Sequence, residues 1–140
     1  MALVVDASAL YSQADAADPG HRAVAGSLAE ERGPLITSQS VATEADHLIL
    51  ARLGVDIELE YLRDLASGTF AVECLQRDEI AAAREVIARY RDLSIGLGDA
   101  SLVVLAHRYR TRRLLTFDER AFRAITPLQG GNFMILPADA

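Results

Sequence analysis

The chain begins with a short apolar run, Leu3-Val4-Val5, that leads directly into a carboxylate, Asp6. An uninterrupted run of this kind, rich in β-branched residues, is typical of a strand covered on both faces, as in a parallel sheet between helices. Asp6 then follows the carboxyl end of that strand. Because ligands bind at this edge of open α/β sheets, we expect Asp6 to belong to a functional site.

The rest of the chain alternates short apolar segments with helical patterns. Further strands are predicted over 35–37, 69–74, 113–116 and 133–136. Helices are predicted over 7–13, 21–32, from Ser38 or Ser40 to 53, 56–66 with Asp56 as its cap, 77–91, 99–110 and 118–124. No repeat or flexible linker interrupts this order. The sequence therefore predicts one domain over residues 1–140, a three-layer α/β/α sandwich with a central, mainly parallel sheet.

Composition limits the class of protein. No apolar run approaches the roughly 20 residues of a membrane span, and the N-terminus lacks the pattern of a secretory signal. Cys74 is the only cysteine, so no internal disulfide can form, and we expect its thiol in the core. The net charge of −6 argues against a general nucleic-acid coat protein. We expect a cytoplasmic protein with no membrane association.

The basic residues exclude several phosphate-handling folds. All 14 basic side chains are arginine. Haloacid-dehalogenase-like phosphatases and response-regulator receivers use a lysine at the phosphate site, and the former also need a second acid where this chain has Ser8. A Rossmann domain would need G-x-G-x-x-G after the first strand, and this motif is absent. These classes do not fit.

Three further carboxylates stand in helical patterns that are otherwise apolar. Asp99 precedes Leu102, Val103 and Ala106 on one predicted stripe. Similar positions are occupied by Asp118, before Ala121, Phe122 and Ile125, and by Glu44, between Val41 and Leu48. Unpaired buried carboxylates are costly and repel one another, and a divalent cation removes both costs. Ligands that are all oxygen favour Mg²⁺ or Mn²⁺ over zinc.

The residues alone leave alternatives open. Asp99 and Asp118 also suit helix N-caps, the commonest role of Asp at such positions. Asp46 fits the apolar periodicity of its helix better than Glu44 does, so periodicity does not choose between them. The three histidines have no metal-ligand spacing, although His47 could reach the pocket from its position near Glu44. The four tyrosines are too scattered for a base-stacking platform.

Four segments together resemble a PIN domain of the kind found in VapC toxins of bacterial VapBC toxin–antitoxin pairs. They are Leu3–Leu10, Val41–Leu48, Gly96–Leu102 and Leu115–Phe122, and the similarity extends to about Leu136. The resemblance implies a Mg²⁺-dependent endoribonuclease, with Mn²⁺ as the other candidate metal. It also implies that the catalytic, metal-binding quartet is Asp6, Glu44, Asp99 and Asp118.

Individual roles follow from the same resemblance. Asp6 and Asp99 match the most dependable metal ligands, and Asp118 matches the most variable one. The resemblance selects Glu44 over Asp46. Ser8 and Thr116 would be polar supports of the pocket, although a capping hydroxyl and a strand residue are the ordinary alternatives. A metal-activated water would hydrolyse the phosphodiester bond.

Partners are implied as well. The resemblance implies an RNA substrate, a VapB-type antitoxin and a homodimer. The apolar helices over 41–53 and 57–66 suggest an antitoxin groove, for which the candidates are Leu10, Tyr11, Leu48, Leu62 and Leu65. The run Arg108, Arg110, Arg112 and Arg113 either contacts RNA or is a solvated helix end. The alternative function is a protein-binding or metal-binding module with structural carboxylates and no nuclease activity.

Overall fold

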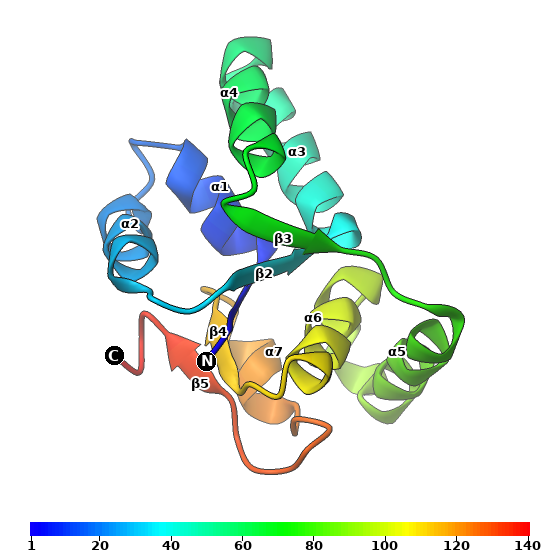
Figure 1. The fold of residues 1–140 in the computed structure, drawn as a ribbon. Coiled ribbons are helices and arrows are strands. Elements are labelled where there is room, and N and C mark those ends of the chain that lie inside the picture. The colour runs from blue at the N-terminus through cyan, green and yellow to red at the C-terminus, as the bar shows by residue number, and fades with distance from the viewer.

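The computed structural model describes all 140 residues. Helices pack on both faces of a five-stranded sheet (Figure 1). The strands are β1 (Leu3–Val5), β2 (Leu35–Ser38), β3 (Phe70–Glu73), β4 (Arg113–Leu115) and β5 (Met134–Leu136). The helices are α1 (Ala7–Ala14), α2 (His21–Glu30), α3 (Gln39–Leu53), α4 (Val55–Ala66), α5 (Arg77–Arg89), α6 (Leu97–Arg108) and α7 (Glu119–Ala124), with a 3₁₀ turn, η1 (Arg91–Leu93). The predicted α/β/α sandwich is confirmed.

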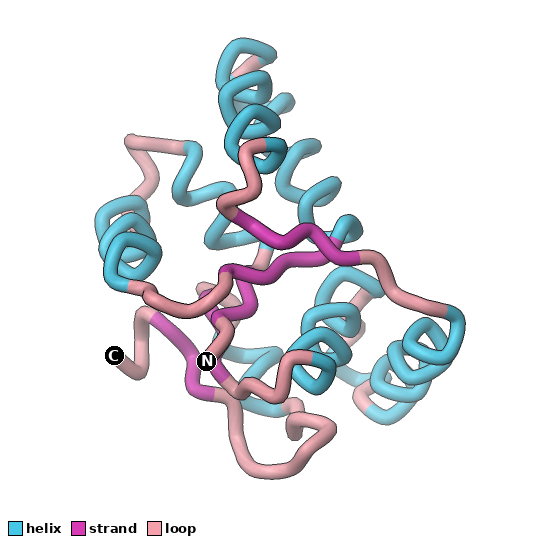
Figure 2. Tube along the Cα trace, in the orientation of Figure 1, coloured by secondary structure: helices cyan, strands magenta, loops and turns pink.

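Every strand pair in the sheet is parallel, so the carboxyl ends of all five strands lie at one edge. The strand order is β3-β2-β1-β4-β5. The chain builds outward from β1 to β3 and then returns to the other side of β1 for β4 and β5. Helices α1–α4 lie on one face and α5–α7 on the other, with the strands as a band between them (Figure 2). The neighbours β1 and β4 thus form the switch point of the sheet, where ligands bind in open α/β folds.

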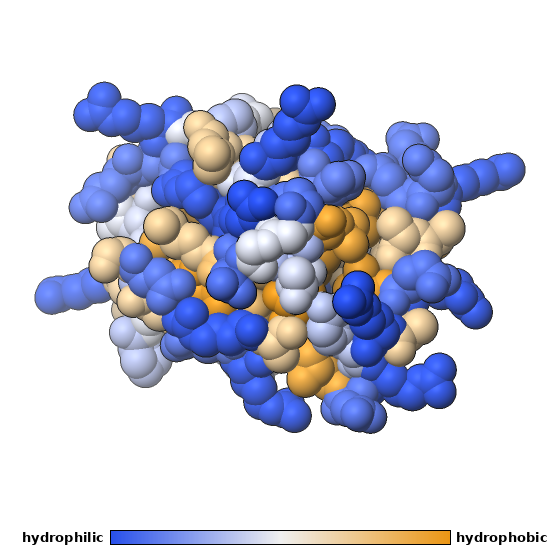
Figure 3. All heavy atoms as spheres, turned by 90° about the horizontal axis from the view of Figure 1, so that it is seen from below, coloured by the Kyte–Doolittle hydropathy of each residue, from blue (hydrophilic) through white to orange (hydrophobic).

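The core explains why β1 is so apolar. Leu3, Val4 and Val5 have no exposed surface, and they belong to one cluster of 32 buried residues. On the face seen in Figure 3, long hydrophilic side chains project outward and apolar atoms are confined to patches between them. No helix is both long and apolar enough to cross a membrane.

Several local predictions need correction. Helix α4 begins at Val55 after Gly54, whose φ of 90° suits a glycine, so Asp56 is not its cap. Helix α6 begins at Leu97, two residues before Asp99. Cys74 is exposed, because it leaves the sheet just after the edge strand β3 and does not enter the core. Ser38, and not Ser40, caps α3 by accepting from the Val41 amide at 3.0 Å.

Candidate metal centre

Asp6 lies at the switch point, directly after β1, with only 4% of its surface exposed. One carboxylate oxygen accepts from the Ala7 amide at 2.7 Å. The other accepts from the Thr116 hydroxyl at 2.6 Å and from the Ser8 hydroxyl at 3.2 Å. Burial raises the pKa of Asp6, and these three hydrogen bonds only partly oppose that effect. The carboxylate is therefore held firmly but lacks a compensating cation.

Ser8 and Thr116 connect the first turn of α1 to the segment after β4. Their hydroxyl oxygens are 3.3 Å apart, and both contact the same oxygen of Asp6. Thr116 Oγ1 also accepts from the Asp118 amide at 2.9 Å, and Ser8 Oγ accepts from the Phe117 amide at 3.0 Å. The two hydroxyls orient Asp6 and fix the segment that leads to Asp118.

Asp99 approaches the same region from the first turn of α6. It is not the N-cap, because Gly96 holds that position without a side-chain bond. The stripe that follows it is buried as expected at Leu102, Val103 and Ala106. Burial raises the pKa of Asp99 to about 7, and the charges of Asp6, Asp118 and Glu44 add to the shift in that order. The other three predicted carboxylates therefore all act electrostatically on Asp99.

Glu44 projects from α3 toward the start of α6. Its Oε2 lies 3.3 Å from the point that a Cβ on Gly98 would occupy, so the carboxylate lies against the backbone beside Asp99. Burial and the charge of Asp6 raise its pKa. Glu44 and Asp99 share a solvent-open hollow of about 420 Å³ with His47. His47 is exposed in this hollow, and it does not belong to any group of three possible metal ligands.

Asp46 lies in a different environment from Glu44. A hydrogen bond with Asp46 raises the pKa of Glu58, and burial together with the charge of Asp46 raises the pKa of Tyr61; both residues belong to α4. One of its carboxylate oxygens is buried without a hydrogen-bond partner. Asp46 thus contributes to the packing of α3 on α4, whereas Glu44 faces α6 and the other carboxylates.

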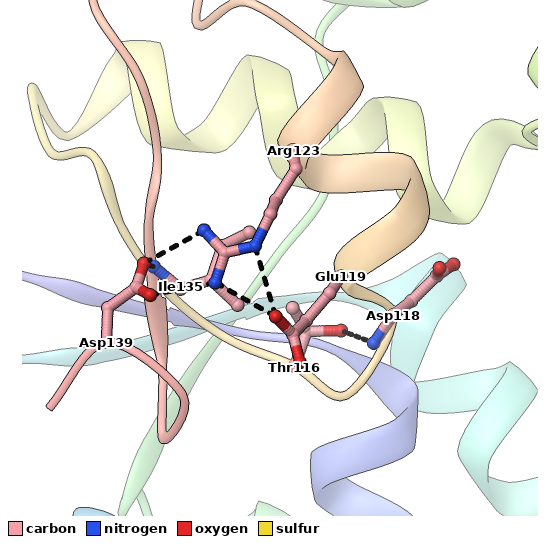
Figure 4. A network of polar contacts seen from close by, with 6 residues as sticks. All are labelled: Thr116, Asp118, Glu119, Arg123, Ile135 and Asp139. Atoms are coloured by element: carbon pink, nitrogen blue, oxygen red, sulfur yellow. Dashed lines mark hydrogen bonds and ion pairs between the residues drawn. The ribbon is translucent and has the colours of Figure 1, made fainter.

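Asp118 is the N-cap of α7, and its charge also acts on the other carboxylates. It caps α7 by accepting from the Ala121 amide at 3.3 Å, and its charge raises the pKa of both Asp99 and Asp6. Figure 4 shows its carboxylate pointing away from Arg123, whose guanidinium pairs with Glu119 and Asp139 at 2.9 and 2.7 Å. Arg123 is therefore paired with other acids and not with Asp118.

The donor set suits a divalent metal ion, although the side chains do not form a closed ligand cage. No three Asp, Glu, His or Cys side chains are grouped closely enough to hold a metal ion as they stand. None of the four carboxylates forms an ion pair with an arginine or histidine. Asp6 is buried and Asp99 is half-buried, whereas Glu44 and Asp118 are exposed. Mutually repelling carboxylates that offer only oxygen donors are the ligands of a hard cation such as Mg²⁺. Asp6, Asp99, Glu44 and Asp118 could hold it.

A buried serine pair that the sequence did not single out holds α3 and α6 together beneath this centre. Ser101 Oγ donates to Ser38 Oγ at 2.7 Å and approaches the Gly98 carbonyl at 2.6 Å. Ser38 caps α3 and Ser101 lies one half-turn after Asp99, so the contact sets the spacing of Glu44 and Asp99. The only sequence signal was a polar residue within an apolar helix.

The arginine run serves mainly as a set of structural contacts. Arg108 pairs with Glu73 and Glu79, each at 2.6 Å, and Arg113 pairs with Glu31 at 2.6 Å. Arg112 donates to the backbone carbonyls of Gly130 and Gln129. Only Arg110 of the four makes no ion pair or hydrogen bond through its side chain.

The residues predicted for an antitoxin groove are divided among several places. Leu10 and Leu65 line a hollow of about 130 Å³ between α1, α4 and β3. Tyr11 lines a separate hollow beside Phe117, Leu48 packs against the core, and Leu62 is exposed on α4. The groove therefore remains a prediction, centred on Leu10 and Leu65.

Comparison with known proteins places these features in context. A family model described as the PIN domain matches residues 3–126. Ribonuclease VapC26 of Mycobacterium tuberculosis is 42% identical over 135 residues, which cover 96% of this chain and all of that protein.

Solved structures share the fold. The Mycobacterium tuberculosis toxin VapC20, described as cleaving the sarcin-ricin loop, has a TM-score of 0.78 at 20% identity over 84% of this chain and 90% of its own. Rickettsia felis VapBC2, bound to a promoter DNA fragment, has a TM-score of 0.67 at 12% identity, over 96% of this chain and 97% of its own. A Klebsiella pneumoniae toxin–antitoxin complex has a TM-score of 0.66 at 18% identity, over 88% of this chain and 92% of its own.

Proposed function

The chain belongs to the PIN-domain family, and from this premise we propose that it is a divalent-metal-dependent endoribonuclease, the toxin of a VapBC-type pair in the cytoplasm. One observation carries the proposal. Asp6, Glu44 and Asp118 all raise the pKa of Asp99, and none of these carboxylates is paired with a cation. A related protein is named a ribonuclease, which supports RNA as the substrate class.

We assign Mg²⁺ as the metal, with Mn²⁺ as the alternative, because every candidate ligand is a carboxylate oxygen. When bound, the ion neutralises the repelling carboxylates and lowers the pKa of a water that attacks the phosphorus atom. Asp6 and Asp99 are the main ligands. The chain has no lysine and no histidine cluster that could take the place of the carboxylates in activating a water.

The remaining residues have distinct tasks in the proposed reaction. The Thr116 and Ser8 hydroxyls and the Ala7 amide orient the Asp6 carboxylate. Glu44 lies on the open side of the centre, where it can accept a proton from the attacking water. Asp118 completes the negative pocket while it caps α7.

An RNA cleavage assay tests this function. We expect cleavage by the wild type in Mg²⁺, none in EDTA, and a loss of more than about 100-fold in kcat/KM for Asp6→Asn and for Asp99→Asn. Asp56→Asn, on the exposed first turn of α4, is the matched control and should retain activity. Metal-independent cleavage, or full activity of both Asp6→Asn and Asp99→Asn, would reject the mechanism.

We also propose that a VapB-type antitoxin silences the enzyme by inserting an apolar segment into the hollow lined by Leu10 and Leu65, and that the toxin forms a homodimer. The hollow is bounded by α1 and α4, and α4 has exposed apolar residues at Val55, Leu59 and Leu62. Leu65→Ala should weaken antitoxin binding at least about tenfold. Leu128→Ala, an exposed leucine in the loop before β5, should not. Titrations with the purified antitoxin measure both affinities, and equal affinity of Leu65→Ala and the wild type would reject this location.

A further inference from the structure

Phe117 is an exposed aromatic residue between two residues of the carboxylate centre, Thr116 and Asp118. Its side chain is 42% exposed, although its backbone amide is anchored on Ser8 Oγ at 3.0 Å. The surrounding hydrogen bonds of Ser8, Thr116 and Asp118 fix the base of this residue. A rigid backbone therefore presents an uncovered ring next to the reaction centre.

The ring forms one wall of a solvent-open hollow of about 530 Å³, which we call the Phe117 hollow. It is lined by Ser8, Tyr11, Asp18, Pro19, Gly20 and Phe117. The far edge of the ring packs on the backbone at Gly20, since a Cβ there would overlap the ring atoms Cζ and Cε2 of Phe117. The hollow thus depends on a residue without a side chain at position 20.

The part of the lining formed by Asp18, Pro19 and Gly20 is held in place by hydrogen bonds. Asp18 Oδ2 accepts from the Ser12 hydroxyl at 2.8 Å and from the Gly20 amide at 2.9 Å. The His21 ring nitrogen Nδ1 lies 2.8 Å from the Ser12 carbonyl, which ties the start of α2 to α1. The hollow is therefore formed before any ligand enters, and its occupant needs to order little of the protein.

The lining favours a flat, uncharged ring over a phosphate. None of its residues is an arginine or a histidine, and its one charged residue, Asp18, would repel a phosphate. Arg52 lies 5.3 Å from the centroid of the Tyr11 ring, where it makes a cation–π contact. Phe117, Tyr11 and Pro19 supply apolar surface, and Ser8 and Asp18 supply polar edges. This combination is the one by which proteins bind unstacked nucleobases.

The hollow is also continuous with the proposed catalytic centre. Ser8 lines the hollow, and its hydroxyl lies 3.2 Å from Asp6 Oδ2. A nucleotide whose phosphate lies at the carboxylates has its own base, or that of its neighbour, within reach of the ring. We propose that the Phe117 hollow holds a nucleobase of the RNA substrate next to the scissile phosphate, stacked on Phe117. This inference rests on the proposed ribonuclease function.

Kinetics of Phe117 variants provide the first test. Loss of one stacked base typically weakens binding by about 5- to 100-fold. We expect KM for single-stranded RNA to rise within that range for Phe117→Ala and Phe117→Leu, with kcat changed less, and Phe117→Tyr to stay close to the wild type. Gly20→Ala should act in the same direction by displacing the ring. Leu128→Ala, 45% exposed and away from the hollow, is the control.

A substrate series locates the base. In RNA with a single abasic nucleotide moved along the sequence, one position beside the cut should raise KM for the wild type and have little further effect in Phe117→Ala. Phe117→Leu with wild-type KM, or equal abasic effects in both proteins, would overturn the proposal. So would weaker antitoxin binding by Phe117→Ala at unchanged RNA KM, which would assign the hollow to a protein partner.

A binding measurement separates this inference from the nuclease function. With Ca²⁺ in place of Mg²⁺, single-stranded RNAs that carry 2-aminopurine at successive positions are titrated with the protein. At one position the fluorescence should change on binding to the wild type and not on binding to Phe117→Ala. If the wild type cuts no RNA yet shows this difference, the nuclease function fails and the base site stands. If it cuts RNA and shows no difference, only the base site fails.

Discussion

At the scale of single residues, the Thr116 hydroxyl joins two of the carboxylates that we propose as metal ligands, Asp6 and Asp118. It is 1% exposed, donates to Asp6 at 2.6 Å and accepts from the Asp118 amide. Thr116→Val keeps the shape and removes both bonds, so the charged form of Asp6 loses support. We expect about a 10- to 100-fold loss of kcat/KM, partly restored by higher Mg²⁺ concentration, in cleavage assays across a metal titration.

Thr111 provides the matched control for that change. It is also 1% exposed, and its hydroxyl donates to the Ala2 carbonyl at 2.7 Å, away from the carboxylates. Thr111→Val should lower the free energy of unfolding by about 1–3 kcal/mol and leave the metal dependence of activity unchanged. The role assigned to Thr116 is wrong if the two variants have the same metal dependence.

Asp118 allows its two roles to be separated. Asn is as good an N-cap as Asp but carries no charge. Asp118→Asn should therefore preserve stability, lower the pKa of Asp99 toward its ordinary range and weaken metal binding. Asp118→Ala should in addition lose about 1 kcal/mol of stability because the α7 cap is lost. Thermal unfolding and Mg²⁺ titration of both variants would distinguish these effects, and equal metal affinity of Asp118→Asn and wild type would contradict a role in the centre.

At the scale of elements, the close approach of α3 to the first turn of α6 sets the spacing of Glu44 and Asp99. A Cβ on Gly98 would meet Glu44 Oε2 at 3.3 Å and Val41 Cγ2 at 3.7 Å. Alanine is favoured over glycine in a helix by about 1 kcal/mol, so Gly98→Ala should not destabilise the fold. It should nevertheless weaken metal binding and RNA cleavage by pressing on Glu44.

Gly26 in α2 provides a control for Gly98→Ala, because a Cβ on Gly26 would meet no atom within 4 Å. Gly26→Ala should raise the melting temperature and leave activity unchanged. Melting curves and Mg²⁺-dependent cleavage rates of the two variants report both quantities. Full activity of Gly98→Ala would show that the spacing of α3 and α6 does not control the centre.

The elements also show what the sequence could predict. The apolar run before Asp6 and the stripe after Asp99 placed two carboxylates at one sheet edge, because both patterns depend on local periodicity alone. Glu44 and Asp46 differ only in which helix each faces, α6 or α4, and that depends on packing between distant segments. The acids that pair with Arg108 and Arg113 lie far away in the chain, and Phe117 gave no signal because exposure of one residue follows from its neighbours in space.

At the scale of the whole molecule, gathering four carboxylates makes stability depend on pH and metal. Burial and the neighbouring charges raise the pKa of Asp99 to about 7, and burial raises that of Asp6. In the unfolded chain both titrate near pH 4. Between these values the folded protein retains protons that the unfolded chain has released. The contribution of these two carboxyls to the free energy of unfolding is thus fully present at low pH and is lost as the pH rises through about 7.

We therefore expect the melting temperature in EDTA to fall as the pH is raised from about 5.5 to about 8. Glu31, Glu79 and Asp139 have pKa values lowered by arginines, so their contributions change only at more acidic pH. Mg²⁺ at about 100 times its Kd should restore stability by about 2.7 kcal/mol. Asp99→Asn should flatten the pH dependence and reduce the Mg²⁺ shift. A wild-type melting temperature that does not fall in EDTA, or an undiminished Mg²⁺ shift in Asp99→Asn, would mean that repulsion among these carboxylates is not what the metal relieves.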